Sequence, residues 1–218
     1  MKLTTKSLAL STATFGLMLG LAQNAQAGRI TGVTISATSP NLTQNWQLIN
    51  VINGSGLPGN KPSLNGIHAL PAIDNAWRTD NATAAKPLPS PANPLSITFK
   101  LGAVPTNLGG LSFWNMTGTS RTMGVQNANL EYSTDGSNFS SLWTGSFAQG
   151  TVAASGPEKI DFNRVEGVTH VRLNITSNYG QAQRVGFNEI AFKSIPEPSA
   201  SLALLGLGLA GVGLRKRI

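Results

Sequence analysis

The chain has 218 residues, with 16 Lys and Arg against 9 Asp and Glu, and it contains no cysteine. Disulfide-stabilised scaffolds are therefore excluded, and the folded part must rely on its own hydrophobic core. Without the charged residues of the two end segments (Lys2, Lys6, Glu197, Arg215, Lys216 and Arg217), 11 basic and 8 acidic residues remain, with no basic run, so nucleic acid is a poor candidate partner.

The first 27 residues have the three-part pattern of a secretory signal peptide. Lys2 and Lys6 make a basic start, an apolar stretch covers residues 8–21, and Ala25-Gln26-Ala27 has the small residues of a cleavage site. The apolar stretch is short for a transmembrane helix. We therefore expect residues 1–27 to form a signal helix that directs export and is then removed.

Residues 28–194 lack a helical pattern and contain short alternating or β-branched runs bounded by turn residues. The Pro-rich residues 84–94 favour a surface crossing rather than a central strand. The segment 45–53 is compatible with a strand or a short helix. The other runs predict strands at 29–37, 95–101, 111–116, 128–133, 140–147, 158–162, 170–176 and 186–193. About eight strands at this spacing predict an all-β antiparallel sandwich or barrel.

The order of several motifs points to one family. An Ala-x-Asp loop leads to a Trp in residues 68–81, YSTDGSNF covers 132–139, and VRLNITSN covers 171–178. Over about residues 65–193 this order resembles the discoidin or coagulation-factor C-type domain. The resemblance implies a galactose-binding-like jelly-roll β-sandwich over residues 28–194.

The resemblance also implies a structural calcium site. In such domains the Ala-x-Asp loop and the Glu of the last strand often meet at the ion, which places Asp74 and Glu189 as ligands, with Asp80 as a further oxygen donor. Asn75 departs from the pattern, because Gly usually follows the Asp. In the alternative, Asp74 caps a turn and Glu189 sits at a strand edge without metal.

The ligand surface of these jelly rolls lies on loops at one end of the sandwich. Sugar recognition needs an aromatic face together with planar hydrogen-bonding groups. Trp77 with Arg78, and Asn178 with Tyr179, supply both kinds and are the candidate ligand-binding residues. A Trp at the first position is also often buried in the family, so a purely structural role stays open.

Catalysis is disfavoured by the residues present. The chain between the end segments has only His68 and His170, and no nucleophile–base motif is visible. Two hypotheses remain. One is a carbohydrate-binding protein that holds exopolysaccharide or a surface glycan. The other is a structural or adhesive matrix protein without a defined sugar pocket.

The last segment, residues 195–218, has three parts. Pro196-Glu197-Pro198 is extended because proline disfavours helix, residues 199–214 are uncharged and apolar, and Arg215-Lys216-Arg217 forms a basic stop. The apolar run is somewhat shorter than the ~20 residues that span a bilayer. The basic residues extend its reach and favour the cytoplasmic side. This pattern predicts a short membrane helix.

These three parts resemble the PEP-CTERM sorting tail of Gram-negative bacteria. The resemblance implies that the export machinery threads the chain across the inner membrane and that an exosortase processes it near Pro196-Glu197-Pro198. The mature protein would then reach the cell surface or the extracellular matrix. A plain membrane anchor that is never cut is the alternative.

Overall fold

A computed structural model describes residues 27–195 of the chain. The expected signal helix, the Pro196-Glu197-Pro198 motif and the expected membrane helix lie outside the described residues. Residues Gly28–Ser194 make up a single packed unit. Among residues 27–195 we find no helix with the length and apolarity needed to cross a membrane.

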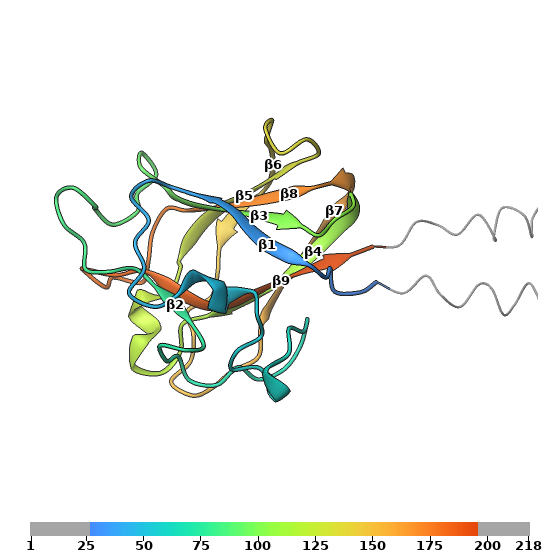
Figure 1. Cartoon of the computed structure of the whole chain (residues 1–218). Coiled ribbons are helices and arrows are strands. Elements are labelled where there is room, and N and C mark those ends of the chain that lie inside the picture. The colour runs from blue at the N-terminus through green and yellow to red at the C-terminus, as the bar shows by residue number, and fades with distance from the viewer. Residues whose placement is uncertain (1–26, 196–218) are drawn as a thin grey trace, which may run out of the picture. The chain divides into compact units, whose positions relative to one another are not determined.

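Two antiparallel sheets pack face to face in this unit (Figure 1). The five-stranded sheet has, in spatial order, β1 (Val33–Thr38), β3 (Leu95–Leu101), β8 (His170–Ile175), β5 (Asn127–Ser133) and β6 (Ser140–Ser146). The four-stranded sheet has β2 (Trp77–Arg78), β9 (Gly186–Ser194), β4 (Thr106–Asn115) and β7 (Glu158–Val168). Three short 3₁₀ helices lie in the connections: η2 (Leu48–Val51), η3 (Pro58–Asn60) and η4 (Gly118–Met123).

The predicted all-β sandwich is thus confirmed, with differences in detail. Strand β3 has the predicted bounds, but β4 begins five residues before the predicted 111–116, in a Gly-containing stretch without alternation. Gly110 allows this extension, because a Cβ there would lie 2.7 Å from both Asp161 Oδ1 and Ile160 O of β7. The ambiguous segment 45–53 contains η2 rather than a strand. Strand β2 has only two residues, too few for a periodic signal.

Aromatic rings fill the centre of the sandwich. The Phe113 and Phe147 rings stack with centroids 3.9 Å apart, and the Phe187 ring lies 5.0 Å from that of Phe113 and 5.5 Å from that of Trp77. All four side chains are buried. Each such pair contributes about 0.5–1.5 kcal/mol beyond the burial of its area. This continuous core explains how the fold forms without disulfides.

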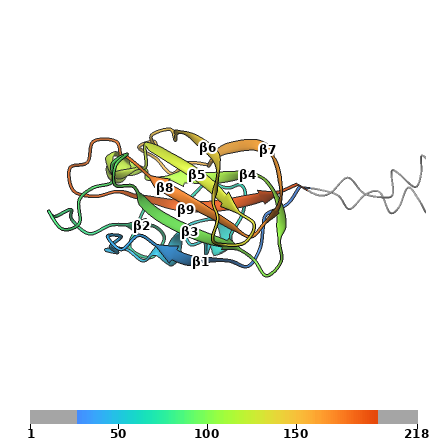
Figure 2. The same cartoon turned by 90° about the horizontal axis from the view of Figure 1, so that it is seen from above.

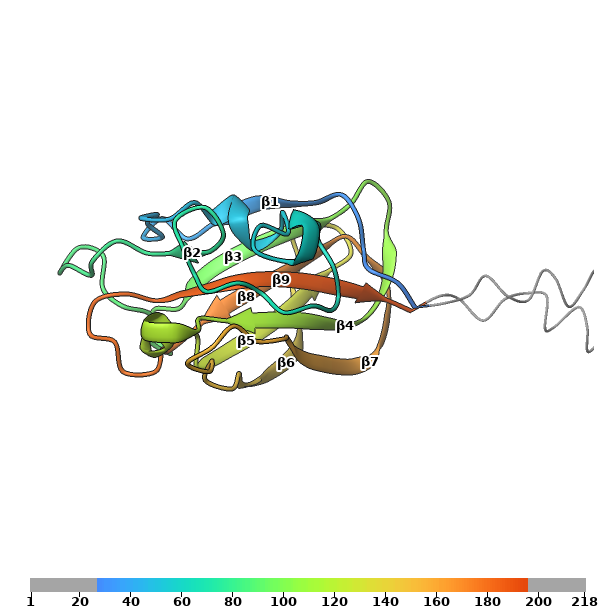
Figure 3. The ribbon, with the colours of Figure 1, turned by 90° about the horizontal axis from the view of Figure 1, so that it is seen from below.

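The outer face of the four-stranded sheet is covered by the chain between β1 and β2. Leu57 and Leu64 of this connection pack on Trp114 and Ala191 of the sheet. Trp114 Nε1 donates to Gly66 O at 3.0 Å. We call residues 48–76 the cover, and Figure 3 shows its 3₁₀ turns lying over the β9 side. Polar side chains on this face of β9 are therefore buried.

The two ends of the sandwich differ. Gly28 and Ser194 meet at one end, where Ser194 N donates to Gly28 O at 2.8 Å. The connections 39–47, 79–94 and 176–185 gather at the opposite end (Figures 1 and 2). We call these three connections, with the adjoining Arg78, the loop end. It is the side of the domain farthest from the point where the chain continues into residues 195–218.

Candidate functional site

Hydrogen bonds hold the segments of the loop end in fixed relation. The amides of Asn45 and Trp46 donate to Arg78 O at 3.0 and 3.3 Å, and Ala82 N donates to Gln183 O at 2.7 Å. Asp80 N donates to Thr43 Oγ1 at 3.0 Å. The surface is therefore pre-organised, although it is built from three segments far apart in the sequence.

Arg78 and Trp46 form a stacked pair on this surface. The guanidinium carbon of Arg78 lies 3.9 Å from the Trp46 ring centroid, and Arg78 Nε donates to Asn45 Oδ1 at 2.9 Å. Both side chains are partly exposed. A cation–π contact at an exposed site contributes about 0.5–1 kcal/mol, and together with the Asn45 hydrogen bond it favours one orientation of the guanidinium. The guanidinium thus covers one face of the Trp46 ring, and the pair combines an aromatic group with an oriented planar donor.

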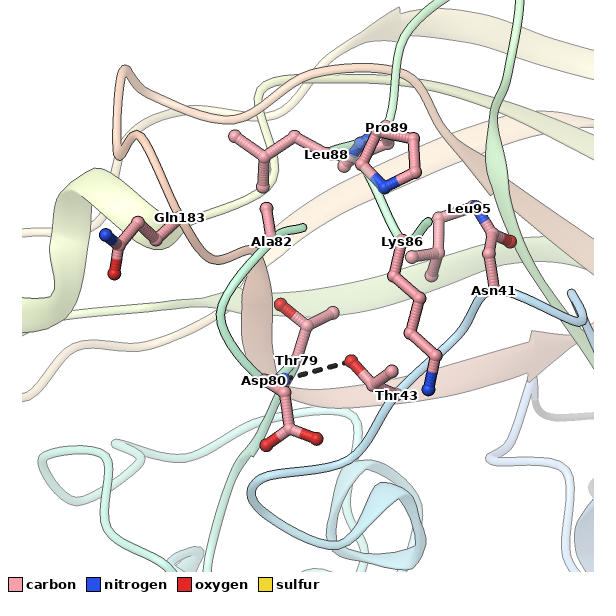
Figure 4. Close-up of a pocket in the computed structure, with 11 residues that line it drawn as sticks. Asn41, Thr43, Thr79, Asp80, Ala82, Lys86, Leu88, Pro89, Leu95 and Gln183 are labelled. Carbon is pink, nitrogen blue, oxygen red and sulfur yellow. Dashed lines mark hydrogen bonds between the residues drawn. The ribbon is translucent and has the colours of Figure 1, made fainter. Parts of the chain in front are cut away.

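A shallow groove with a volume of about 10 Å³, room for about one water molecule, lies between the segments 41–43 and 79–89, beginning one residue after Arg78 (Figure 4). Its wall carries a carboxylate, an amine, a hydroxyl and amides, and Leu88, Pro89 and Leu95 provide apolar contacts. Asn41 Nδ2 is buried and has no hydrogen-bond partner among residues 27–195. A buried donor of this kind is satisfied by water or by a ligand. The polar lining residues are Asn41, Thr43, Thr79, Asp80, Lys86 and Gln183.

Positive charge is concentrated at the loop end. Partial burial lowers the pKa of Arg78, and the nearby charge of Arg184 lowers this pKa further. The Nε of Arg184 is buried without a hydrogen-bond partner in the described part of the chain. Lys86 is exposed on the groove wall. The surface therefore carries three cations with donor groups that can face a ligand.

Trp77 does not belong to this surface, and the hypothesis that its ring contacts a sugar is wrong. Its side chain is 0% exposed and packs edge-on against Phe187 in the core. Successive residues of a strand point to opposite faces, so Trp77 faces the core when Arg78 faces outward. Trp46 takes the expected aromatic place beside Arg78. The sequence gives little sign of this, since Trp46 is 32 residues away from Arg78.

Asn178 and Tyr179 lie at the loop end, but their polar atoms serve the fold. Asn178 Nδ2 donates to Gln181 O and Arg184 O, both at 2.7 Å, and Asn178 Oδ1 accepts from Gly180 N at 2.9 Å. The Tyr179 hydroxyl donates to Phe147 O. Desolvation is the main cause of the raised pKa of Tyr179. Their part in ligand binding stays a prediction, while their part in shaping this connection is direct.

A second hollow, with a volume of about 330 Å³, lies beside η4. Leu70, Pro71 and Val152 make its apolar walls, and residues 117–121 supply hydroxyls and the Arg121 side chain. It has no aromatic lining. Its size is at the lower limit of ordinary small-molecule pockets of about 300–1,000 Å³, but it lacks the stacked ring found at the loop end.

The two residues expected to bind calcium lie in different surroundings. Asp74 is in an exposed turn, whereas Glu189 is 0% exposed beneath the cover. Both carboxylate oxygens of Glu189 accept from Gly54 N, at 3.1 and 3.2 Å. Burial raises the pKa of Glu189 to about 8, against the smaller opposing effects of the Gly54 hydrogen bond and the Arg29 charge. The protein itself thus supplies a hydrogen-bond donor to both carboxylate oxygens of Glu189.

The backbone around Asp74 is also satisfied internally. Asn50 Nδ2 donates to Ile73 O at 3.1 Å and to Ala76 O at 3.0 Å, which uses carbonyl groups that would otherwise suit a hard cation. No cluster of three or more His, Cys, Asp or Glu side chains occurs within residues 27–195. These contacts give the calcium hypothesis no support, and it stays a prediction that depends on Asp74, Glu189 and further oxygen atoms.

Neither histidine forms a hydrogen bond with a carboxylate among residues 27–195. His68 is buried, and its Nδ1 lies 2.8 Å from Ala69 O. His170 Nδ1 lies 2.9 Å from Thr169 Oγ1. No salt bridge among the described residues involves a histidine. We assign no catalytic residue, and the loop end presents groups suited to binding.

Comparison with known proteins gives two kinds of match. Residues 194–217 match the PEP-CTERM protein-sorting motif. The chain carries a PEP-CTERM sorting signal. This signal implies an exported protein that is sorted to the surface. No curated protein matches the chain in sequence.

The sandwich is similar to solved carbohydrate-binding modules and discoidin-type domains. A family 32 carbohydrate-binding module from a family 31 glycoside hydrolase of Clostridium perfringens matches with a TM-score of 0.53 and 17% identity, over 77% of this chain and 94% of that module. A coagulation-factor 5/8 type C domain from Bacteroides fragilis matches with a TM-score of 0.48 and 14% identity, over 78% of this chain and 97% of that domain. At such low identity, the Clostridium match supports the fold alone.

Proposed function

We propose that this PEP-CTERM protein binds carbohydrate through its loop end, after export and exosortase processing near Pro196-Glu197-Pro198. The sorting signal supports delivery to the cell surface, where polysaccharides are the abundant ligands of an exporting cell. Exopolysaccharide made by the same cell is the ligand class that fits this location best.

The observation that carries the binding proposal is the Trp46–Arg78 pair beside the polar groove. Sugars present weakly polarised C–H faces and many hydroxyl groups, so their sites combine an aromatic plane with planar donors and acceptors. The loop end has both, at a distance of 3.9 Å between the Arg78 guanidinium carbon and the Trp46 ring centroid. Because backbone hydrogen bonds fix these segments, little ordering entropy is lost on binding.

Affinity electrophoresis in gels that contain the cell's own polysaccharide tests this proposal. We expect the unmodified domain to be retarded, and Trp46→Ala to reduce the retardation about tenfold in apparent affinity, the loss of roughly 1.4 kcal/mol. Trp143→Ala is a matched control, since Trp143 is a partly exposed Trp on β6 outside the loop end. Equal retardation of folded Trp46→Ala and parent protein overturns the site.

A matrix role without a sugar pocket is supported by a different observation. The cover and the connection after β6 expose large apolar side chains: Ile67, Leu70, Ile73 and Val152 are 63%, 51%, 66% and 71% exposed. Exposed apolar residues that gather on one surface favour association. Analytical ultracentrifugation distinguishes the two roles: a concentration-dependent assembly that Leu70→Ser with Val152→Ser abolishes, with no polysaccharide retention, favours the matrix protein.

A further inference from the structure

Two arginines meet at the loop end through the pairing of β2 with β9. Arg78 lies opposite Gly186 in the register, and Thr79 N donates to Val185 O at 2.9 Å. This antiparallel pairing brings Arg184 to the same edge as Arg78. Partial burial is the main cause of the lowered pKa of Arg78, and the repulsion of the nearby Arg184 guanidinium lowers this pKa further.

These arginines lack an acidic partner within the domain. Three salt bridges are found among residues 27–195, and all lie elsewhere: Arg164–Glu166, Arg172–Glu131 and Lys193–Asp161. Arg78 Nε donates to the neutral Asn45 amide oxygen, and Arg184 Nε is buried without a hydrogen-bond partner in the described residues. Two neighbouring cations that are partly desolvated and unneutralised raise the free energy of the unliganded surface.

The nearby charged groups do not cancel this positive charge. Asp80 is the one carboxylate that lines the adjoining groove, and Lys86 is the one amine. Together with Arg78 and Arg184, the surface holds three cations against one anion. An arginine fork matches the geometry of a carboxylate, and a charge-assisted pair is about twice as strong as a neutral hydrogen bond.

Resting on the proposed function, we infer that the carbohydrate is acidic, with a uronate carboxylate bound between Arg78 and Arg184 and the sugar chain continuing over the exposed surface past Lys86. The guanidinium groups neutralise the carboxylate, while the buried Asn41 Nδ2, which has no hydrogen-bond partner among the described residues, is a further donor for a sugar oxygen. Sulfated sugars share the negative charge, but their tetrahedral group does not match the planar fork as a carboxylate does.

Polygalacturonate and its methyl ester provide a matched pair of probes, because esterification removes the charge and keeps the sugar chain. In affinity electrophoresis we expect at least tenfold tighter apparent binding to the free acid than to the ester. Dextran sulfate is a control for negative charge without a carboxylate. If the protein binds dextran sulfate as tightly as polygalacturonate, the assignment of a carboxylate ligand is overturned. Equal binding to acid and ester, or binding to neutral glycans only, overturns the inference but leaves the proposed function intact.

Variants that remove one charge each locate the anion. Arg184→Gln and Lys86→Gln are expected to weaken polygalacturonate binding about tenfold and several-fold, whereas Lys100→Gln, an exposed lysine on β3 at the opposite end, changes it less than twofold. Lys86 and Lys100 carry the same charge, so a nonspecific charge effect would weaken both variants equally and overturn the inference. Arg78→Gln would also disturb the stack with Trp46, and its effect could therefore reflect a change in the fold. For this reason the test uses Arg184→Gln and Lys86→Gln.

Discussion

Two regions of the sandwich hold charged groups without a salt bridge, and burial distinguishes them. Beneath the cover, Glu189 is fully buried and accepts hydrogen bonds from Gly54 N. At the loop end, Arg78 and Arg184 are partly exposed. A buried carboxyl can avoid the cost of its charge by keeping a proton, but an arginine stays charged. The first region therefore points to pH-dependent stability, and the second points to an anionic ligand.

The largest expected effect is on stability, and it distinguishes the buried Trp77 from the partly exposed Trp46. Trp77→Ala removes a fully buried ring and should lower the free energy of unfolding by about 3–5 kcal/mol. Trp46→Ala removes a partly exposed ring and its cation–π contact, and should cost about 1 kcal/mol. Urea unfolding followed by fluorescence measures both. Similar losses in the two variants would mean that the interior and the loop end are not distinct.

The second prediction concerns Glu189 and pH. Its pKa is raised from 4.5 to about 8, so the folded state keeps a proton that the unfolded state releases above about pH 4.5. The unfolded state then binds fewer protons, and stability falls as pH rises from about 4.5 to about 8, by on the order of 5 kcal/mol.

Glu189→Gln keeps the hydrogen-bond acceptor and cannot titrate, so this variant should lose most of that pH dependence. The lowered pKa values of His68 and His170 act below about pH 6.5 with the opposite sign, and they are common to both proteins. The difference between parent and variant thus isolates Glu189. A parent protein whose urea midpoint is constant between pH 6.5 and 8 contradicts the assignment.

The calcium hypothesis assigns a different role to the Glu189 carboxyl, that of a metal ligand. If Asp74 and Glu189 share an ion, calcium at 100 times its Kd stabilises the folded state by about 2.7 kcal/mol. On this hypothesis a chelator lowers the melting temperature of metal-loaded protein, and Glu189→Gln abolishes the difference. If a chelator does not change the melting temperature of calcium-saturated protein, the calcium hypothesis is wrong.

The smallest expected effect is at the edge of the loop end. Tyr179→Phe removes the hydroxyl that donates to Phe147 O and should lower stability by about 1 kcal/mol, the ordinary net value of one hydrogen bond. Polysaccharide retention should be unchanged if the hydroxyl serves only the fold. Reduced retention at unchanged stability, measured by affinity electrophoresis and thermal melting, assigns Tyr179 to the ligand surface instead.

The strands were predictable because alternation and turn residues are local signals. Leu95–Leu101 alternates and forms β3, and Asp135-Gly136 closes the hairpin between β5 and β6. The acidic side chain of that turn accepts hydrogen bonds from Ser137 N and Asn138 N, both at 2.8 Å. Such turn chemistry acts within a few residues, so it can be recognised without knowing the fold.

The site was less predictable, because its residues meet only through long-range pairing. Arg78 was expected to bind ligand, but its aromatic neighbour on the surface is Trp46 rather than the adjacent Trp77. The proximity of Arg184 depends on the register of β2 against β9, and β2 is only two residues long. The burial of Glu189 depends on the cover, whose irregular backbone has no periodic signature.

The position of Ser194 has a mechanical consequence. A polysaccharide held at the loop end and a tail that continues from Ser194 would load the domain along β9, which is hydrogen-bonded on both sides, to β2 and β4. Interstrand bonds lie perpendicular to an antiparallel strand, so a pull along its axis strains many of them at once. Single-molecule pulling between Lys86 and Ser194 should need more force than pulling between Gly28 and Ser194, which separates the bonds at that end one after another. A surface protein with this geometry would resist flow best when its ligand is bound.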